Sequence, residues 1–340
     1  MLNLRRKNAI ISKVKGKNMI DLHSHSTASD GQLSPSALVD KAVRIGLSAL
    51  ALTDHDVVSG LDEFQEQADL YPKFKAINGC ELGAKHYANI EIIALDIPDI
   101  APFAEREKKL IDIRNNANKE RLEKLASLGM KIDYDEIAFD ENGKVRTLIG
   151  KPHIVDAMLK HGYISEHAEG YKKYLNKGCP AYVKKQDPDW KETISFIKEN
   201  GAVAVLAHPR FTGLDGKDLF DAIAEMKQNG LDGIEVFHAE HSPDQMRQYF
   251  SIAKELNLIV SGGSDFHGMA HPETELGYGI GKNLNILDGV LDVIINRGQP
   301  NFNLYQECLN SCLKGQVEAV SSQNVLLGHS CDQAHNQNVR

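Results

Sequence analysis

The stretch that decides the fold is Met19-Ile-Asp-Leu-His-Ser-His25, a short run that ends in two histidines. Short runs of this kind, bounded by polar residues, are typical of buried strands. Side chains at positions i and i+2 of a strand point to the same face, so His23 and His25 can reach one metal ion. An isolated pair of this kind is common by chance, so its meaning depends on what ends the other strands.

Six further strand-like runs follow, at residues 49–53, 74–78, 90–95, 202–206, 233–237 and 258–260. Metal-binding residue types follow or interrupt most of them: Asp54, His55, Asp56, Glu81, Glu91, His208, His238, Asp265 and His267. Together they predict a metal centre. Two alternatives remain open: Asp54 or Asp56 can cap a helix, and His208 can be a satisfied core histidine.

Helical segments separate many of these strands. Ser34 and Pro35 are suited to start one helix, and Ser242 and Pro243 are suited to start another. Alternating strands and helices favour a largely parallel sheet, and α/β barrels present active sites at the carboxyl ends of their strands. We therefore predict an α/β barrel built from residues 19–97 and 196–300.

Three segments do not follow this pattern. Residues 98–195, with a long charged helix over 104–128, are predicted to form a helical insertion over the active site. Residues 1–18 are basic and lack the apolar stretch of a signal peptide, which predicts a flexible extension. Residues 301–340 are rich in Asn, Gln and Ser, which predicts a loosely ordered C-terminal tail.

The composition bounds the kind of protein. With 340 residues, 42% hydrophobic, and a formal charge of −8, the chain is ordinary for a globular protein. The charge argues against a stable complex with nucleic acid, and no apolar run of about 18 residues predicts a membrane span. The five cysteines have no disulfide-like spacing, so we expect reduced thiols and a cytoplasmic location.

Five stretches together resemble the PHP (polymerase and histidinol phosphatase) family, in its branch of nucleoside 3′,5′-bisphosphate phosphatases and 5′-3′ exonucleases. They are Asp21-Leu-His-Ser-His-Ser-Thr-Ala-Ser-Asp-Gly31, Leu52-Thr-Asp-His-Asp56, Gly79-Cys-Glu81, Ala207-His-Pro209 and Ser264-Asp-Phe-His267. The likeness runs from about Met19 to about residue 290. It implies a distorted (β/α)7 barrel and a centre of two or three divalent metal ions.

The resemblance also implies a ligand set. One metal ion would be held by His23, His25, Glu81 and Asp265, a second by Glu81 and His208, and a third by Asp30, His55 and His267. Where the family usually has a histidine, this chain has Glu91, which adds negative charge and a harder oxygen donor. This favours Mn²⁺, with Zn²⁺, Fe²⁺ or Mg²⁺ as alternatives, and the second position could also be partly empty.

The activity implied is hydrolysis of phosphate monoesters of nucleotides, such as a nucleoside 3′,5′-bisphosphate, by a metal-bound hydroxide. The expected catalytic residues are His208 and Asp265, and the expected substrate-binding residues are Lys151, His153, Arg210 and His238, with His241 nearby. The expected partner is a small phosphorylated substrate, a nucleotide or short oligonucleotide. Alternatives are a 5′-3′ exonuclease on short RNA or DNA, an amidohydrolase, and a metal-binding regulatory domain without turnover.

Overall fold

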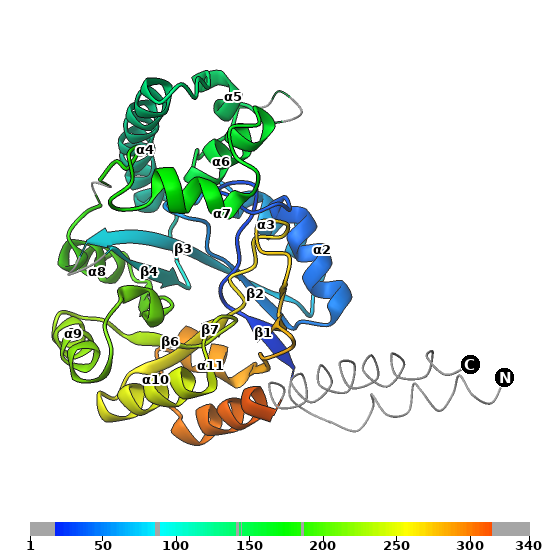
Figure 1. The fold of residues 1–340 in the computed structure, drawn as a ribbon. Coiled ribbons are helices and arrows are strands. Elements are labelled where there is room, and N and C mark those ends of the chain that lie inside the picture. Colours follow the sequence, from blue (N-terminus) through cyan, green and yellow to red (C-terminus); the bar gives the residue numbers. More distant parts are fainter. Residues whose placement is uncertain (1–17, 86–88, 141–142, 144, 185–186, 315–340) are drawn as a thin grey trace, which may run out of the picture.

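The computed structural model describes residues 18–85, 89–140, 143, 145–184 and 187–314. Its centre is an eight-stranded, nearly closed sheet in the order β10-β1-β2-β3-β4-β5-β6-β7 (Figure 1). The strands are β1 (Met19–Asp21), β2 (Ala49–Leu52), β3 (Lys75–Lys85), β4 (Asn89–Leu95), β5 (Val203–Leu206), β6 (Gly233–His238), β7 (Ile259–Gly263) and β10 (Ile286–Leu287). A separate hairpin pairs β8 (Thr274–Glu275) with β9 (Gly279–Ile280).

All seven predicted strands are present, as β1 to β7. The sheet is largely parallel, but β4 runs antiparallel to both β3 and β5, and β10 runs antiparallel to β1. The eighth strand, β10, spans only two residues and is too short for a sequence pattern to indicate. Because β4 is reversed, its first residues lie at the same rim of the barrel as the carboxyl ends of its neighbours.

The chain segments that follow β1 and β7 pair with each other and close the barrel. Asp265 N donates to His23 O over 2.9 Å, and His25 N donates to Phe266 O over 3.0 Å. At Gly263 a Cβ atom would lie 2.3 Å from His23 N, so only glycine permits this approach. This closure places the two histidines after β1 beside the residues that follow β7.

Helices cover the outside of the sheet (Figure 1). They are α2 (Pro35–Ile45), α3 (Leu61–Ala68), α8 (Trp190–Glu199), α9 (Gly216–Gln228), α10 (Pro243–Glu255) and α11 (Gly289–Ile295), with the 3₁₀ turn η2 (Pro209–Thr212) after β5. Ser34 and Ser242 cap α2 and α10 as predicted, by accepting from Ala37 N and Gln245 N. The apolar faces of these helices bury the main core against the strands.

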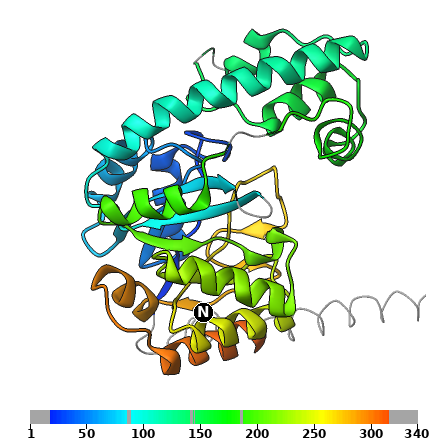
Figure 2. The same cartoon turned by 90° about the vertical axis from the view of Figure 1, so that its left-hand side faces the viewer.

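The segment between β4 and α8 forms a helical lobe above the barrel (Figure 2). Its elements are α4 (Ala101–Ser127), α5 (Tyr134–Ala138), α6 (Lys151–Lys160), α7 (His167–Gly170) and the π-helical turn η1 (Tyr171–Leu175). Helix α4 joins the two parts, because Phe103 and Leu110 lie in the main core whereas Leu122 and Leu125 lie in a second core. No helix in the described part of the chain is long and apolar enough to cross a membrane.

Two predicted boundaries differ from the structure. Trp190 and Ile194 of α8 pack into the main core, so the barrel resumes at α8 and not at residue 196. Residues 302–314 are helical and bury Tyr305 and Cys308 in the same core, so the predicted loose attachment from residue 301 is wrong for this part. The tail as a whole is polar, but the apolar residues of 302–314 recur at helical spacing and pack against the core. Residues 1–17 and 315–340 lie outside the described chain.

Candidate metal centre

The nine predicted metal ligands converge at one rim of the barrel, on the side of the helical lobe. They belong to overlapping groups whose ligand atoms lie within 4.8 Å of one another: His25, Asp30, His55 and His267; His23, His25 and Asp265; His23, Glu81 and His208; His55, Glu81 and Glu91. Strand ends that are far apart in sequence therefore supply one cluster of histidines and carboxylates.

Glu81 lies at the middle of this cluster and is fully buried. Its Oε2 is 2.8 Å from His55 Nδ1, and its Oε1 is 2.9 Å from His208 Nε2 and 3.4 Å from His23 Nε2. Glu91 adds a second carboxylate, 3.6 Å from His55 Nδ1 and 3.5 Å from His208 Nε2. Glu81 thus lies between histidines from three strand ends, with Glu91 beside two of them.

Asp265 faces the histidines after β1. Its Oδ1 lies 3.3 Å from His23 Nε2 and 3.1 Å from His25 Nε2, and its Oδ2 lies 3.3 Å from His238 Nε2. The backbone of Asp265 has φ 56°, and that of His208 has φ 22°. Residues other than glycine rarely adopt positive φ values. Such backbone strain persists where the surrounding fold enforces it, often at functional sites.

Asp30 forms the outer edge of the cluster. Its Oδ1 is 3.4 Å from His267 Nε2 and 4.0 Å from His25 Nδ1, and its Oδ2 is 3.9 Å from His55 Nε2. The loop that carries it is tied down by Asp54, which accepts from Ser26 N over 2.8 Å and from Ser29 Oγ over 2.5 Å. Asp30 therefore lies in a turn, as its sequence context suggests, and also points into the cluster.

The donor atoms of the cluster fit divalent metal ions. Within the described structure, seven buried atoms of the cluster have no hydrogen-bond partner: His23 Nε2, His25 Nδ1 and Nε2, Asp30 Oδ1, His55 Nδ1, Glu81 Oε2 and Asp265 Oδ1. Their mutual approaches lack hydrogen-bond geometry, whereas buried polar atoms of proteins are nearly always satisfied. Imidazole nitrogens and carboxylate oxygens of this kind are ordinary ligands of Mn²⁺, Fe²⁺ and Zn²⁺.

A second layer of carboxylates orients the ligands, and sequence reasoning missed it. Glu235, fully buried on β6, has Oε1 3.1 Å from His23 Nδ1 and accepts from His208 N through Oε2 over 2.8 Å. Asp21, at the end of β1, accepts from Ser264 N, just after β7, over 2.9 Å. In the sequence, the sign of such an orienting carboxylate was an acidic residue inside an otherwise apolar strand.

The predicted alternative of helix capping by Asp54 or Asp56 is wrong. Helix α3 follows Gly60 and has no side-chain cap. Asp56 instead accepts from Gly83 N over 2.9 Å and pairs with Arg114 of α4, whose Nε lies 2.9 Å from Asp56 Oδ2. The carboxylate therefore links the rim of the barrel to the long helix of the lobe.

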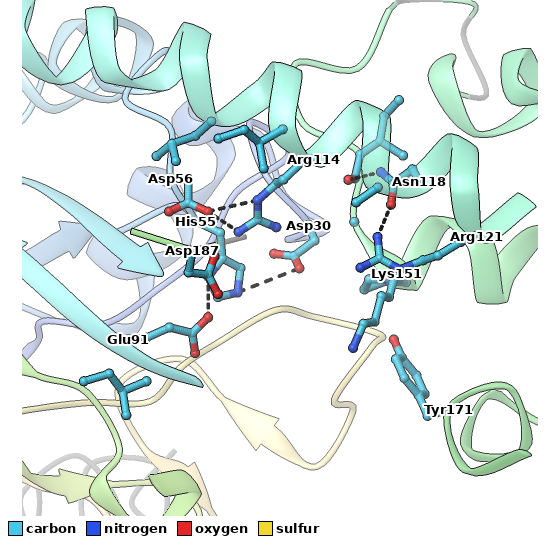
Figure 3. Close-up of a pocket in the computed structure, with 17 residues that line it drawn as sticks. Asp30, His55, Asp56, Glu91, Arg114, Asn118, Arg121, Lys151, Tyr171 and Asp187 are labelled. Carbon is cyan, nitrogen blue, oxygen red and sulfur yellow. Dashed lines mark hydrogen bonds and ion pairs between the residues drawn. The ribbon is translucent and has the colours of Figure 1, made fainter. Parts of the chain in front are cut away.

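A cavity of about 310 Å³ opens beside the cluster, between the barrel and the lobe (Figure 3). Asp30, His55 and Glu91 border it at one end, and Arg121, Lys151 and Tyr171 lie toward the other. The remaining polar wall includes Arg114, Asn118 and Asp187. The predicted Lys151 thus lines the cavity, whereas the α4 side chains Arg114, Asn118 and Arg121 were missed, although their spacing places them on one helix face.

Arg121 is the distinctive member of this wall because it is 6% exposed and forms no ion pair with a carboxylate in the described residues. Its Nη1 donates to Asn118 Oδ1 over 2.7 Å, and its Nε has no partner in the described structure. Burial and the neighbouring Arg114 lower the pKa of its guanidinium, and the opposing effect of Glu120 and Asp187 is smaller, so the buried charge is only partly compensated. An anion in the cavity would complete that compensation.

The other predicted substrate residues do not line this cavity. His153 accepts from Gly150 N over 2.9 Å at the start of α6. Arg210 lies 3.1 Å from Glu240 Oε2 and lines a different cavity, with Asp215 and Tyr249. His238 is buried against Asp265, and His241 Nδ1 lies 2.9 Å from Val236 O behind it.

The charges of the cluster shift its pKa values strongly. Burial alone would lower the pKa of His55, but Asp30 and Glu81 raise it to about 10. Burial would also lower the pKa values of His208 and His267. Glu81 instead raises the pKa of His208 to about 9, and Asp265 raises that of His267 to about 9. Burial lowers the pKa of His25 to about 3. Without metal, several imidazolium ions therefore compensate the carboxylates, and bound metal ions would have to displace their protons.

Histidines and carboxylates gathered on the rim of an α/β barrel define a metal-dependent hydrolase. The chain belongs to the PHP domain family, whose model matches residues 21–199. It is similar to a 5′-3′ exoribonuclease of Haemophilus influenzae, with 33% identity over 281 residues that cover 80% of this chain and 97% of the relative. A 3′,5′-nucleoside bisphosphate phosphatase of Chromobacterium violaceum is 30% identical, over 76% of this chain and 90% of its own.

A solved structure shows the same fold. A Bifidobacterium adolescentis protein assigned as a metal-dependent phosphoesterase superposes with a TM-score of 0.71 and 29% identity, over 83% of this chain and 96% of its own. The predicted family, the barrel fold and the class of metal-dependent phosphoesterase are confirmed by these comparisons.

Proposed function

We propose that this chain hydrolyses phosphate monoesters of nucleotides that carry a second phosphate, such as a nucleoside 3′,5′-bisphosphate. The observation that carries the proposal is the position of the metal-ligand cluster beside a cavity walled by Arg114, Arg121 and Lys151. A substrate with one phosphate at the cluster can place its second phosphate against Arg121 and Lys151, whereas Arg114 is paired with Asp56. The relative named as a nucleoside bisphosphate phosphatase supports the same substrate class.

We propose two or three divalent ions, with Mn²⁺ preferred. His23, His25, Glu81 and Asp265 would hold one ion, Glu81 and His208 with Glu91 a second, and Asp30, His55 and His267 a third. The carboxylate of Glu91 supplies a hard, anionic donor, which suits Mn²⁺ better than Zn²⁺. Such ions acidify a bound water and neutralise charge on the phosphate oxygens.

The side chains would divide the remaining work. Asp265, 3.3 Å from His238, and His208, whose Nε2 lies 2.9 Å from Glu81, would be the groups that accept and return a proton at the reacting phosphate. Arg121 and Lys151 would orient the second phosphate, with Arg121 offering a planar fork of donors. The helical lobe covers the cavity and would limit its access to water.

The alternatives differ in what supports them. A 5′-3′ exonuclease uses the same phosphorus chemistry, and the Haemophilus influenzae relative carries that name. Membership of the PHP family favours a phosphoesterase over an amidohydrolase. A regulatory domain without turnover would leave the buried Arg121 and the Lys151 of the cavity beside the cluster without a purpose. The cytoplasmic location expected from the cysteines stays a prediction.

The test is phosphate release, with added Mn²⁺, from a nucleoside 3′,5′-bisphosphate, a mononucleotide, a sugar phosphate and a short 5′-phosphorylated RNA. We expect the fastest release from the bisphosphate and its loss in Asp265→Ala. Exposed Asp244→Ala, on the first turn of α10, is the matched control and should retain full activity. Equal rates for the bisphosphate and the mononucleotide would refute the second phosphate site, and no release with any metal would refute hydrolysis of phosphate monoesters.

A further inference from the structure

An exposed aromatic ring stands beside the metal-ligand cluster. Phe211, on the turn η2, is 48% exposed, although large apolar side chains are normally buried. Its ring centre lies 5.0 Å from that of His208 and 6.2 Å from that of His238, with edge-on geometry to both. The backbone of η2 therefore holds the ring at the rim of the barrel, next to a candidate metal ligand.

A neighbouring cation fixes this ring. The guanidinium of Arg210 lies over the ring of Phe211, 5.1 Å from its centre. Arg210 is itself held by Glu240, through the backbone oxygen and through Oε2 at 3.1 Å. A ring that is held by its edges and by one cation, yet remains half exposed, is a preorganised surface for another flat group.

The cluster lies between this ring and the cavity lined by Arg121 and Lys151. Glu91 and His55 border the cavity, whereas His208 contacts Phe211, and Glu91 Oε2 is 3.5 Å from His208 Nε2. A phosphate at the cluster therefore has the enclosed cavity on one side and Phe211 on the other. In a dinucleotide, one nucleotide can enter the cavity while the next extends toward the ring.

We propose that Phe211 is a stacking platform for the nucleobase on the side of the cleaved phosphate opposite the cavity. The inference rests on the proposed function and extends its substrate class to oligonucleotides of two or more residues. Water would cleave the phosphorus–oxygen bond between the two nucleosides, leaving phosphate on one and a hydroxyl on the other. Stacking of one base on an aromatic side chain corresponds to about 5-fold to 100-fold in affinity.

The test compares a 5′-phosphorylated dinucleotide with a nucleoside 3′,5′-bisphosphate in Phe211→Ala, Phe211→Tyr and Phe139→Ala. Phe139 is 40% exposed on the lobe and serves as the matched control. We expect Phe211→Ala to raise KM for the dinucleotide about 5-fold to 100-fold, with kcat and the metal content nearly unchanged. The bisphosphate should be hydrolysed with an unchanged KM, Phe211→Tyr should restore the dinucleotide KM, and the control should match the unmodified protein.

Equal changes in KM for both substrates, or no change for either, would overturn the proposal. Binding provides a second measurement, with a dinucleotide that carries 2-aminopurine as its second base and a phosphorothioate at the cleaved position. We expect its fluorescence to be quenched by the unmodified protein and by Phe139→Ala, but not by Phe211→Ala. If neither substrate is hydrolysed, the proposed function fails, whereas equal quenching by all three proteins shows that the platform itself is wrong.

Discussion

Glu91 is the residue whose chemistry most affects the choice of metal ion. It lies within 3.6 Å of both His55 and His208, so a change there alters one metal position directly. Glu91→His replaces an anionic oxygen donor with a neutral nitrogen donor. We expect the affinity for Zn²⁺ relative to Mn²⁺ to rise on the order of tenfold.

Competition between the two metals, followed by elemental analysis of the protein, measures this ratio without any substrate. Glu91→Gln is the control, because it removes the charge without adding an imidazole, and it should weaken the binding of both metals. A Zn²⁺ to Mn²⁺ ratio that is the same in Glu91→His and the unmodified protein would place Glu91 outside the metal centre.

We expect Glu235 to act by orienting His23, although it also belongs to a group with His23 and His238 that could hold a metal ion. It lies 3.1 Å from His23 Nδ1, the ring nitrogen that faces away from Glu81 and Asp265. Removing its charge in Glu235→Gln leaves that ring less firmly oriented, so we expect metal affinity to fall about 10-fold to 100-fold. Calorimetric titration with Mn²⁺ checks this, with the exposed Glu225→Gln as the control. Affinity that stays within a factor of two would contradict an orienting role.

At the scale of elements, α4 connects the two cores and supplies Arg114 and Arg121 to the cavity, whereas Lys151 comes from α6. Arg121→Gln keeps hydrogen-bonding capacity but removes the charge that faces the cavity. We expect KM for a nucleoside 3′,5′-bisphosphate to rise about tenfold to a hundredfold, because charge-assisted hydrogen bonds to phosphate are lost. Hydrolysis of a mononucleotide should change little.

The exposed Arg247→Gln, on α10, is the matched control for this measurement. If Arg121→Gln reduces hydrolysis of both substrates equally, the side chain stabilises the lobe and does not recognise a second phosphate. Thermal melting of each variant separates a loss of folding from a loss of recognition.

The sequence indicated the elements best where their signal is local. Each of β1 to β7 is a short apolar run, and the caps Ser34 and Ser242 lie directly before their helices. The nine candidate ligands were predicted from residues in or after the strands and from the family resemblance, and the structure brings their side chains together. Helix 302–314 was missed because residues 301–340 as a whole are rich in Asn, Gln and Ser, although Tyr305, Cys308, Leu309 and Cys312 recur at helical spacing.

The missed residues of the site depend on contacts between distant segments. Glu235 orients a histidine that is 212 residues away in sequence. Arg121 faces the cavity only because the lobe folds back over the barrel, and no local pattern distinguishes it from a solvent-exposed arginine. Arg210, in contrast, follows a strand end as a phosphate ligand would, but Glu240 holds it at Phe211.

For the whole molecule, the charged cluster predicts how the stability of the metal-free protein depends on pH. The folded-state pKa values of His55, about 10, and of His208 and His267, about 9, lie above the unfolded value of 6.5. Their stabilisation is complete below pH 6.5 and is lost as the pH rises through 9 to 10. The pKa of His25, about 3, acts oppositely, because stability is lost as the pH falls from 6.5 toward 3.

We therefore expect the melting temperature of the chelated protein to be highest near pH 6.5 and to fall toward pH 10. Thermal scans in a chelator across this range check the prediction, with His55→Gln as a variant that should show a smaller alkaline decrease. Melting temperatures that rise steadily from pH 6.5 to pH 9 would contradict the ion pairing described for the cluster.

The central claim is that the rim cluster binds metal ions that hydrolyse a phosphate ester. The most direct measurement is phosphate release from a nucleoside 3′,5′-bisphosphate after all metal has been removed by chelation, and again after Mn²⁺ is restored. The account predicts no release by the chelated protein, full recovery with Mn²⁺, and no recovery in Asp265→Ala. Undiminished release by the fully chelated protein, or recovery in Asp265→Ala equal to that of the unmodified protein, would contradict it.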